Sequence, residues 1–153
     1  MAEEVLEEQL VVFELAREHY GVNISKVQEI IRSQEITEVP RAPEFIEGVI
    51  NLRGKITPVV DLRKRFGLSA GEHSKDARIV VVEVNGHLVG LMVDRVSEVL
   101  RVSRECVEPP SPPVTTLDSA YLKAIAKLED RLIILLDLDR VLNKEEELAL
   151  KEV

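Results

Sequence analysis

Apolar residues occupy every second position in two well-separated stretches of the chain. Residues 11–15 read VVFEL and residues 80–84 read VVVEV. A period of two residues is typical of a β-strand with one face buried. The first stretch runs into AREHYG and the second into Asn85-Gly86, and Asn-Gly is a strong signal for a tight hairpin turn. We therefore expect a β-hairpin at each place.

A second hairpin is predicted further along each half. Residues 50–62 (INLRGKITPVVDL) and 126–138 (AKLEDRLIILLDL) both read as a strand, a polar turn, another strand and a final Asp-Leu. Pro58 has no N–H to donate, so we expect it at an edge strand or a strand end. A short helical turn should follow each Asp-Leu, capped by Asp61 or Asp137.

These hairpins belong to an internal repeat. A shift of 76 residues places 48–66 on 124–142, and a shift of 69 places 12–31 on 81–100. The second alignment holds five identities: Val12/Val81, Glu14/Glu83, Gly21/Gly90, Val27/Val96 and Glu29/Glu98. Four or five short strands do not make a stable open sheet alone, so each repeat should curl into a small barrel.

The predicted fold is therefore mostly β, with two small barrels of four or five strands each, related by duplication. We expect one domain over residues 9–143, with subdomains at roughly 10–70 and 78–143, and leave open an exchange of strands between them. Residues 1–8 form an N-terminal segment, and KEEELALKEV at 144–153 reads as a polar C-terminal helix or tail.

Composition narrows the classes of function. The chain has 153 residues, a net charge of −8 and a pI near 5.0, which disfavours binding to nucleic acid. Its single cysteine, Cys106, excludes an internal disulfide framework. The acidic start and the lack of a long apolar run predict a soluble, cytoplasmic protein with no direct membrane insertion.

No motif for catalysis holds up against its surroundings. Ser69 lies in GLSAG, which matches a nucleophile elbow, but RKRF precedes it where a buried strand is required. A polar loop is the simpler interpretation, and a small hydrolase using Ser69 stays a remote alternative. His19, His73 and His87 lack ligand-like spacing, so we expect no metal, no cofactor and no enzyme activity.

Four segments in order resemble the CheW family of bacterial chemotaxis coupling proteins. They are LVVFELAREHYGVNISKVQEII, GVINLRGKITPVVDLRKRF, HLVGLMVDRVSEVL and RLIILLDLDRVL, and they cover about residues 9–143. The resemblance implies two SH3-like five-stranded barrels around a shared core. It also implies a non-enzymatic adaptor between chemoreceptor cytoplasmic tips and the regulatory domain of the histidine kinase CheA, a monomer in isolation and part of ring arrays in the cell.

The resemblance also implies the residues of a receptor-binding surface. These are Val27, Glu29, Ile30, Gly48, Arg53, Val96 and Val99. The three valines could instead be core residues, and Gly48 could serve backbone geometry alone. Arg53 is the sharper candidate because its turn carries a cation where the second repeat has Glu129-Asp130, and its planar fork suits carboxylate recognition.

The kinase-facing side is implied to include Ala124 and Ile125. Ala124 stands where the family often has glycine, and a change from glycine to alanine adds only one methyl group. The same scaffold could also serve a non-flagellar array that controls pili or biofilm formation, and this alternative stays open.

Overall fold

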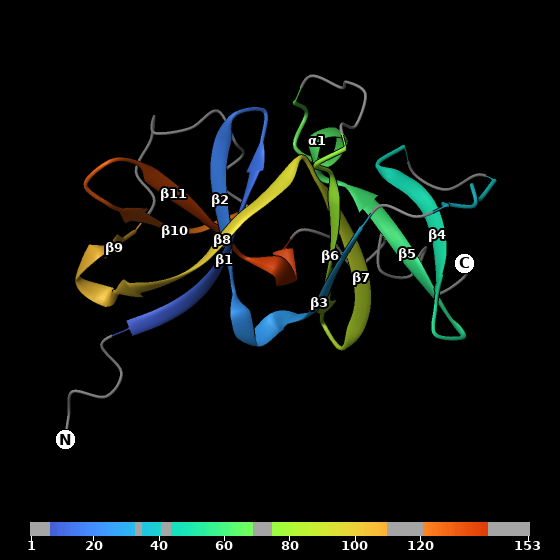
Figure 1. The fold of residues 1–153 in the computed structure, drawn as a ribbon, viewed down its shortest axis with the longest axis horizontal. Helices are drawn as coiled ribbons and strands as arrows, with labels where there is room; N and C mark the ends of the chain where they lie inside the picture. Colours follow the sequence, from blue (N-terminus) through green and yellow to red (C-terminus); the bar gives the residue numbers. More distant parts are fainter. Residues whose placement is uncertain (1–6, 33–34, 41–43, 69–74, 110–120, 141–153) are drawn as a thin grey trace.

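The structure is a computed structural model that describes residues 7–32, 35–40, 44–68, 75–109 and 121–140 (Figure 1). Strands dominate these residues, and the helical segments are single turns: η1 (Ile24–Lys26), α1 (Leu62–Arg65), η2 (Arg104–Cys106) and η4 (Leu138–Arg140). The predicted mostly-β class is confirmed. The C-terminal helix predicted at 144–153 lies outside the described residues.

The strands form two sheets, which we name sheet A and sheet B. Sheet A has the order β8–β1–β2–β11–β10–β9 and sheet B the order β3–β6–β7–β5–β4. The strands of sheet A are β1 (Glu7–Leu15), β2 (Glu18–Asn23), β8 (Arg95–Ser103), β9 (Val107–Glu108), β10 (Leu122–Lys127) and β11 (Leu132–Leu136). Those of sheet B are β3 (Val27–Arg32), β4 (Ile46–Leu52), β5 (Lys55–Asp61), β6 (Arg78–Val84) and β7 (His87–Val93).

Each sheet takes strands from both repeats. The shifts of 69 and 76 residues carry β1, β2 and β3 onto β6, β7 and β8, and β4 and β5 onto β10 and β11. When each strand of sheet B is replaced by its repeat counterpart, the order becomes β8–β1–β2–β11–β10, which is the order of sheet A without β9. The hairpin β1–β2 pairs with β8 and β11, while β6–β7 pairs with β3 and β5. The ranges 10–70 and 78–143 therefore each contribute to both sheets.

The repeated glycines lie where each exchanged hairpin meets its parallel partner. Gly21 is opposite Leu135 and Gly90 is opposite Val59, which are repeat-related pairs. A Cβ at Gly90 would come 2.7 Å from Cγ2 of Ile79, closer than side chains normally approach. The identity of the two glycines is thus explained by close packing inside each sheet.

The hairpin turns lie where the sequence predicts them, but they do not all share one geometry. Asn85 and Gly86 both have positive φ, 48° and 86°, as a two-residue type I′ turn requires. Arg53 and Gly54 adopt the same geometry, with φ of 51° and 86°. The Glu129-Asp130 turn is built differently, because neither of its two central residues has positive φ, although the N–H of Leu128 donates to the carbonyl of Arg131 at 2.9 Å across it.

The expectation for Pro58 is wrong, because β5 is an inner strand between β4 and β7. Pro58 is tolerated since it pairs only with Val49 of β4, and the pairing with β7 begins one residue later at Val59. The missing N–H therefore falls beyond the end of the β5–β7 ladder.

The core has three parts. Alternate residues of β1 and β6, including Phe13 and Val82, lie in a cluster shared between the sheets. Val12 and Val81, on the opposite faces of the same strands, lie in separate clusters within sheet A and sheet B. β1 and β6 are therefore buried on both faces along their middle, and the sequence is continuously apolar there, at residues 10–13 and 79–82.

Candidate binding surface

An ion pair links two of the predicted receptor-binding residues. Arg53, on the β4–β5 turn, donates from Nη1 to Oε1 of Glu29 at 3.1 Å and from Nη2 to the other carboxylate oxygen. Glu29 lies on β3, one edge strand of sheet B, and Arg53 lies on the turn that follows β4, the other edge strand. The hydrogen bond from Arg53 lowers the pKa of Glu29. This bidentate geometry is the one that the guanidinium fork favours.

Sheet A contains the repeat-related ion pair. Glu98 is the counterpart of Glu29, and Arg131 donates to it from Nη2. Arg131 lies two positions beyond Glu129, the counterpart of Arg53, so each repeat pairs this glutamate with an arginine of its second hairpin. Opposite charge in the two turns therefore does not single out Arg53. Arg53 is distinguished instead by its exposure, because 74% of its side chain is accessible to solvent, against 23% of the Arg131 side chain.

The apolar candidates fall into two repeat-related pairs. Val27 and Val96 are half-buried and pack against the shared core, which supports the core interpretation for both. Ile30 and Val99 point outward, with exposed fractions of 39% and 52%. Ile30 lies on β3 next to Glu29, whereas Val96 and Val99 lie on β8 in the other sheet. The structure thus groups Glu29, Ile30 and Arg53 on sheet B.

Gly48 has a structural requirement of its own. Its φ is +150°, and a Cβ there would lie 2.2 Å from the carbonyl oxygen of Thr37. Thr37 exchanges two backbone hydrogen bonds of 2.9 Å with Val49, so the approach of the two chains is fixed. This contact supports the backbone interpretation of Gly48.

The kinase-side candidates lie in the interior of sheet A. Ala124 is the counterpart of Gly48, follows a register shift in β10 and is buried, as is Ile125. Their side chains do not face solvent, while those of Lys123 and Lys127 on the same strand do.

Sequence reasoning missed a second pair of exposed apolar residues. Ile56 on β5 is 60% exposed and Leu132 on β11 is 43% exposed, and the shift of 76 residues relates them. The signal that could have found them was the repeat itself, since an apolar residue beside a turn in both copies is unexpected for a solvated hairpin end.

The catalytic and metal candidates receive no support. Ser69 and His73 lie outside the described residues, and His19 and His87 are in β2 and β7. Within the described ranges, no group of three His, Cys, Asp or Glu side chains is placed to hold a metal ion. None of the helices described there has the length and apolar character needed to span a membrane.

Comparison with known proteins identifies the family. The model of the CheW-like domain matches residues 9–146. The chemotaxis protein CheW of Klebsiella aerogenes is 36% identical over 95% of this chain and 88% of its own, and that of Thermotoga maritima is 35% identical over 99% and 97%. The crystal structure of the scaffolding protein TtCheW from Thermoanaerobacter tengcongensis is 48% identical, with a TM-score of 0.85 over 91% of this chain and 94% of that one. The chain therefore belongs to the family of CheW-like domains, whose members here are chemotaxis and scaffolding proteins.

Proposed function

We propose that this protein is a non-enzymatic coupling protein that bridges the cytoplasmic tips of chemoreceptors and the regulatory domain of the histidine kinase CheA. Membership of the CheW-like family supports this, as do the chemotaxis names of its relatives and the scaffolding role of TtCheW. The observation that carries the proposal is an exposed apolar side chain, Ile30, one residue along β3 from Glu29, whose partner Arg53 has a side chain that is 74% exposed. Apolar anchors next to arginine are typical of sites that dominate protein–protein affinity.

The receptor-binding surface proposed here has a contacting part and a supporting part. Glu29, Ile30, Arg53 and, on the other sheet, Val99 present groups to a partner. The supporting residues Val27, Gly48 and Val96 hold the strands beneath them, through the core and through the Thr37 contact.

The kinase-binding surface proposed here lies along β10 of sheet A. Ala124 and Ile125 are buried, so they act by setting the position of β10, and the exposed neighbours Lys123 and Lys127 are available for contact. In this proposal the protein is cytoplasmic, monomeric when isolated, and joins ring arrays by contacts between its fold and the matching fold of the kinase domain.

A titration of the labelled protein with each partner tests the bridge. Amide chemical shifts would be followed with a chemoreceptor cytoplasmic fragment and, separately, with the regulatory domain of CheA. We expect the receptor to shift residues around Ile30 and Arg53, and the kinase domain to shift β10. Overlapping sets of shifts would contradict a bridge, and no shifts with either partner would leave only the family and fold standing.

A charge swap separates direct contact by Arg53 from a merely structural ion pair. Glu29→Arg with Arg53→Glu preserves the internal pair but reverses the charges shown to a partner. We expect this variant to fold and to lose receptor binding, because the exposed side chain at position 53 is then a carboxylate in place of a guanidinium group. Glu98→Arg with Arg131→Glu is the matched control in the other repeat and should bind normally. Normal receptor binding by the Glu29/Arg53 swap would overturn a direct role for Arg53.

One alternative function for the same coupling role stays open beside the flagellar pathway. The same surfaces would serve a pilus or biofilm array, and chemotaxis rings on agar after deletion of the gene decide between them. No observation among the described residues favours hydrolysis by Ser69, and absence of esterase turnover in the wild type is the expected result.

A further inference from the structure

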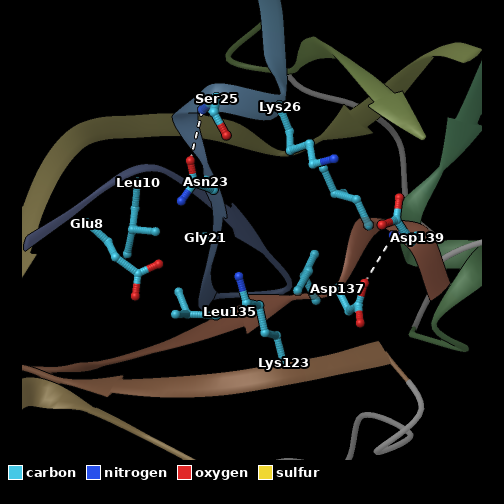
Figure 2. A pocket seen from close by; sticks show the side chains of 12 residues that line it. Glu8, Leu10, Gly21, Asn23, Ser25, Lys26, Lys123, Leu135, Asp137 and Asp139 are labelled. Atoms are coloured by element: carbon cyan, nitrogen blue, oxygen red, sulfur yellow. Dashed lines mark hydrogen bonds between the residues drawn. The ribbon is translucent and has the colours of Figure 1, made fainter. Parts of the chain in front are cut away.

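A pocket of about 350 Å³ opens at one end of sheet A (Figure 2). Its apolar floor is formed by Leu10 of β1, Gly21 of β2 and Leu135 of β11. At Gly21 the side chains of Leu10 and Leu135 come within 3.7 and 3.2 Å of the place where a Cβ would lie, so they cover the backbone there. Volumes of this size are at the lower end of the range that small-molecule sites occupy.

The rim of this pocket carries charges of alternating sign. Figure 2 shows Glu8 and Asp139 at opposite ends, with Lys26 on one side between them and Lys123 on the other. None of these four groups forms an ion pair with another described residue; the Asp139 carboxylate only accepts a long hydrogen bond, 3.4 Å, from the N–H of Asn85. Asp137, also on the rim, is paired with Arg140 at 3.5 Å. The rim therefore offers two ammonium and two carboxylate groups that the described part of the chain does not neutralise.

The internal repeat supplies a comparison within the same molecule. At the matching corner of sheet B, Asn23 is replaced by Met92, whose side chain is buried. Ser25 and Asp139 are replaced by Asp94 and Arg63, and Arg63 Nε donates to Asp94 Oδ1 at 2.8 Å.

Lys123, another charged residue of the rim, also has a different counterpart in sheet B. Lys123 is replaced by Glu47, which pairs with Lys64 at 2.9 Å. Sheet B thus fills this corner with its own methionine and two internal ion pairs. Sheet A keeps the same backbone but leaves the corner open and its charges unpaired among the described residues.

We infer that the pocket of sheet A binds a small zwitterion with an apolar group, of the class of an α-amino acid or a short peptide. The carboxylate of such a ligand would meet one of the two lysines, Lys26 or Lys123, its ammonium would meet the adjacent carboxylate, Glu8 or Asp139, and its apolar group would rest on Leu10 and Leu135. An anion alone would neutralise only the two lysines, and a cation alone only the two carboxylates, whereas a zwitterion meets groups of both signs. Coupling between ligand and protein charges in this partly enclosed place is stronger than on an open surface.

The test is a titration of the full-length protein with L-leucine, followed by amide chemical shifts. We expect saturable shifts at Gly21, Asn23 and Leu135, with dissociation constants up to about 1 mM. N-acetyl-L-leucine lacks the ammonium, L-leucinamide lacks the carboxylate and glycine lacks the apolar group. Each should bind about tenfold more weakly or worse. Equal shifts with all four compounds, or none with leucine at about 10 mM, would overturn the inference.

A variant that copies the matching corner of sheet B tests whether leucine binds in this pocket. Ser25→Asp with Asp139→Arg builds the ion pair of Asp94 and Arg63 across the pocket, and both positions are exposed. We expect this variant to fold normally and to lose leucine binding. Lys123→Glu, which copies Glu47 at another exposed position, is a second variant with the same expected loss. Unchanged leucine binding in both variants would show that the ligand sits elsewhere.

Discussion

At the scale of single residues, two features of sheet B stand out: a glycine that no other residue can replace, and a surface ion pair. Gly48 combines a positive φ with a backbone carbonyl where a side chain would begin. Glu29 and Arg53 combine exposure with a fixed bidentate geometry. The glycine concerns stability, while the ion pair concerns what a partner meets.

Gly48→Ala is expected to destabilise the fold by about 2 kcal/mol or more, because its Cβ would force the chain away from Thr37. Urea unfolding measures this change. Gly54→Ala is the control, since Gly54 also has positive φ, +86°, but nothing lies within 4 Å of its added Cβ. The control should lose only about 1 kcal/mol. Equal losses would show that the Thr37 contact is unimportant.

The Glu29–Arg53 pair predicts a dependence on pH. The pKa of Glu29 is lowered from its ordinary value of 4.5, chiefly by the hydrogen bond from Arg53. A lowered folded-state pKa means that the pair stabilises the fold above the ordinary value, and that this contribution is lost as pH falls through the lowered pKa. Carbon-detected NMR titration of Glu29 should show the shift, and Arg53→Gln should return the pKa toward its ordinary value. An unchanged pKa in Arg53→Gln would rule out the pair in solution.

At the scale of elements, the two helical turns that follow the second hairpins are built alike. The N–H of Asp61 donates to the carbonyl of Phe45 at 2.8 Å, and the N–H of Asp137 donates to that of Tyr121 at 3.0 Å. Asp61 caps α1 by accepting the N–H of Arg63 at 2.9 Å, while Asp137 accepts the N–H of Asp139 at 3.2 Å in η4. The predicted caps are therefore both present.

The two caps should differ in strength. Asp61 is buried, so Asp61→Ala leaves orphan N–H groups in a less solvated place, and we expect a loss of about 1–2 kcal/mol in thermal or urea unfolding. Asp137→Ala should cost less, because its surroundings are more exposed and water replaces the lost acceptor. A larger loss for Asp137→Ala would indicate that the rim of the sheet A pocket depends on that carboxylate for its shape.

At the scale of the whole molecule, the exchange of hairpins makes the two repeats mutually dependent. A fragment of residues 10–70 holds β1–β5 but lacks β6 and β7, which separate β3 from β5 in sheet B. The core cluster between the sheets likewise takes side chains from both repeats. Neither half of the sequence contains a complete sheet.

We therefore expect residues 1–70 and 71–153, expressed separately, to lack cooperative unfolding. Equimolar mixing should restore native amide shifts, because each hairpin then finds the strands of the other half. Circular dichroism and NMR of the fragments and of the mixture measure both outcomes. A fragment of residues 1–70 that unfolds cooperatively alone would contradict the exchanged arrangement.

The sequence by itself determined the strands, the hairpins, the caps and the repeat. These depend on short-range physics, because strand periodicity, positive φ at Asn85-Gly86 and a capping aspartate are read within a few residues. The internal repeat predicted two small barrels, and the resemblance to the CheW family added their SH3-like type and the candidate surface, which alternation alone does not specify.

Only the tertiary structure decided which repeat each hairpin joins. Two nearly equivalent hairpins can pair with either set of edge strands, and the local pattern is the same in both arrangements. The structure also decided that Arg131 replaces the cation absent from the Glu129-Asp130 turn, and that Gly48 faces a carbonyl 11 positions earlier in the chain. It left one corner open in sheet A and closed its counterpart in sheet B. These outcomes depend on contacts between distant residues, which periodicity along one chain does not encode.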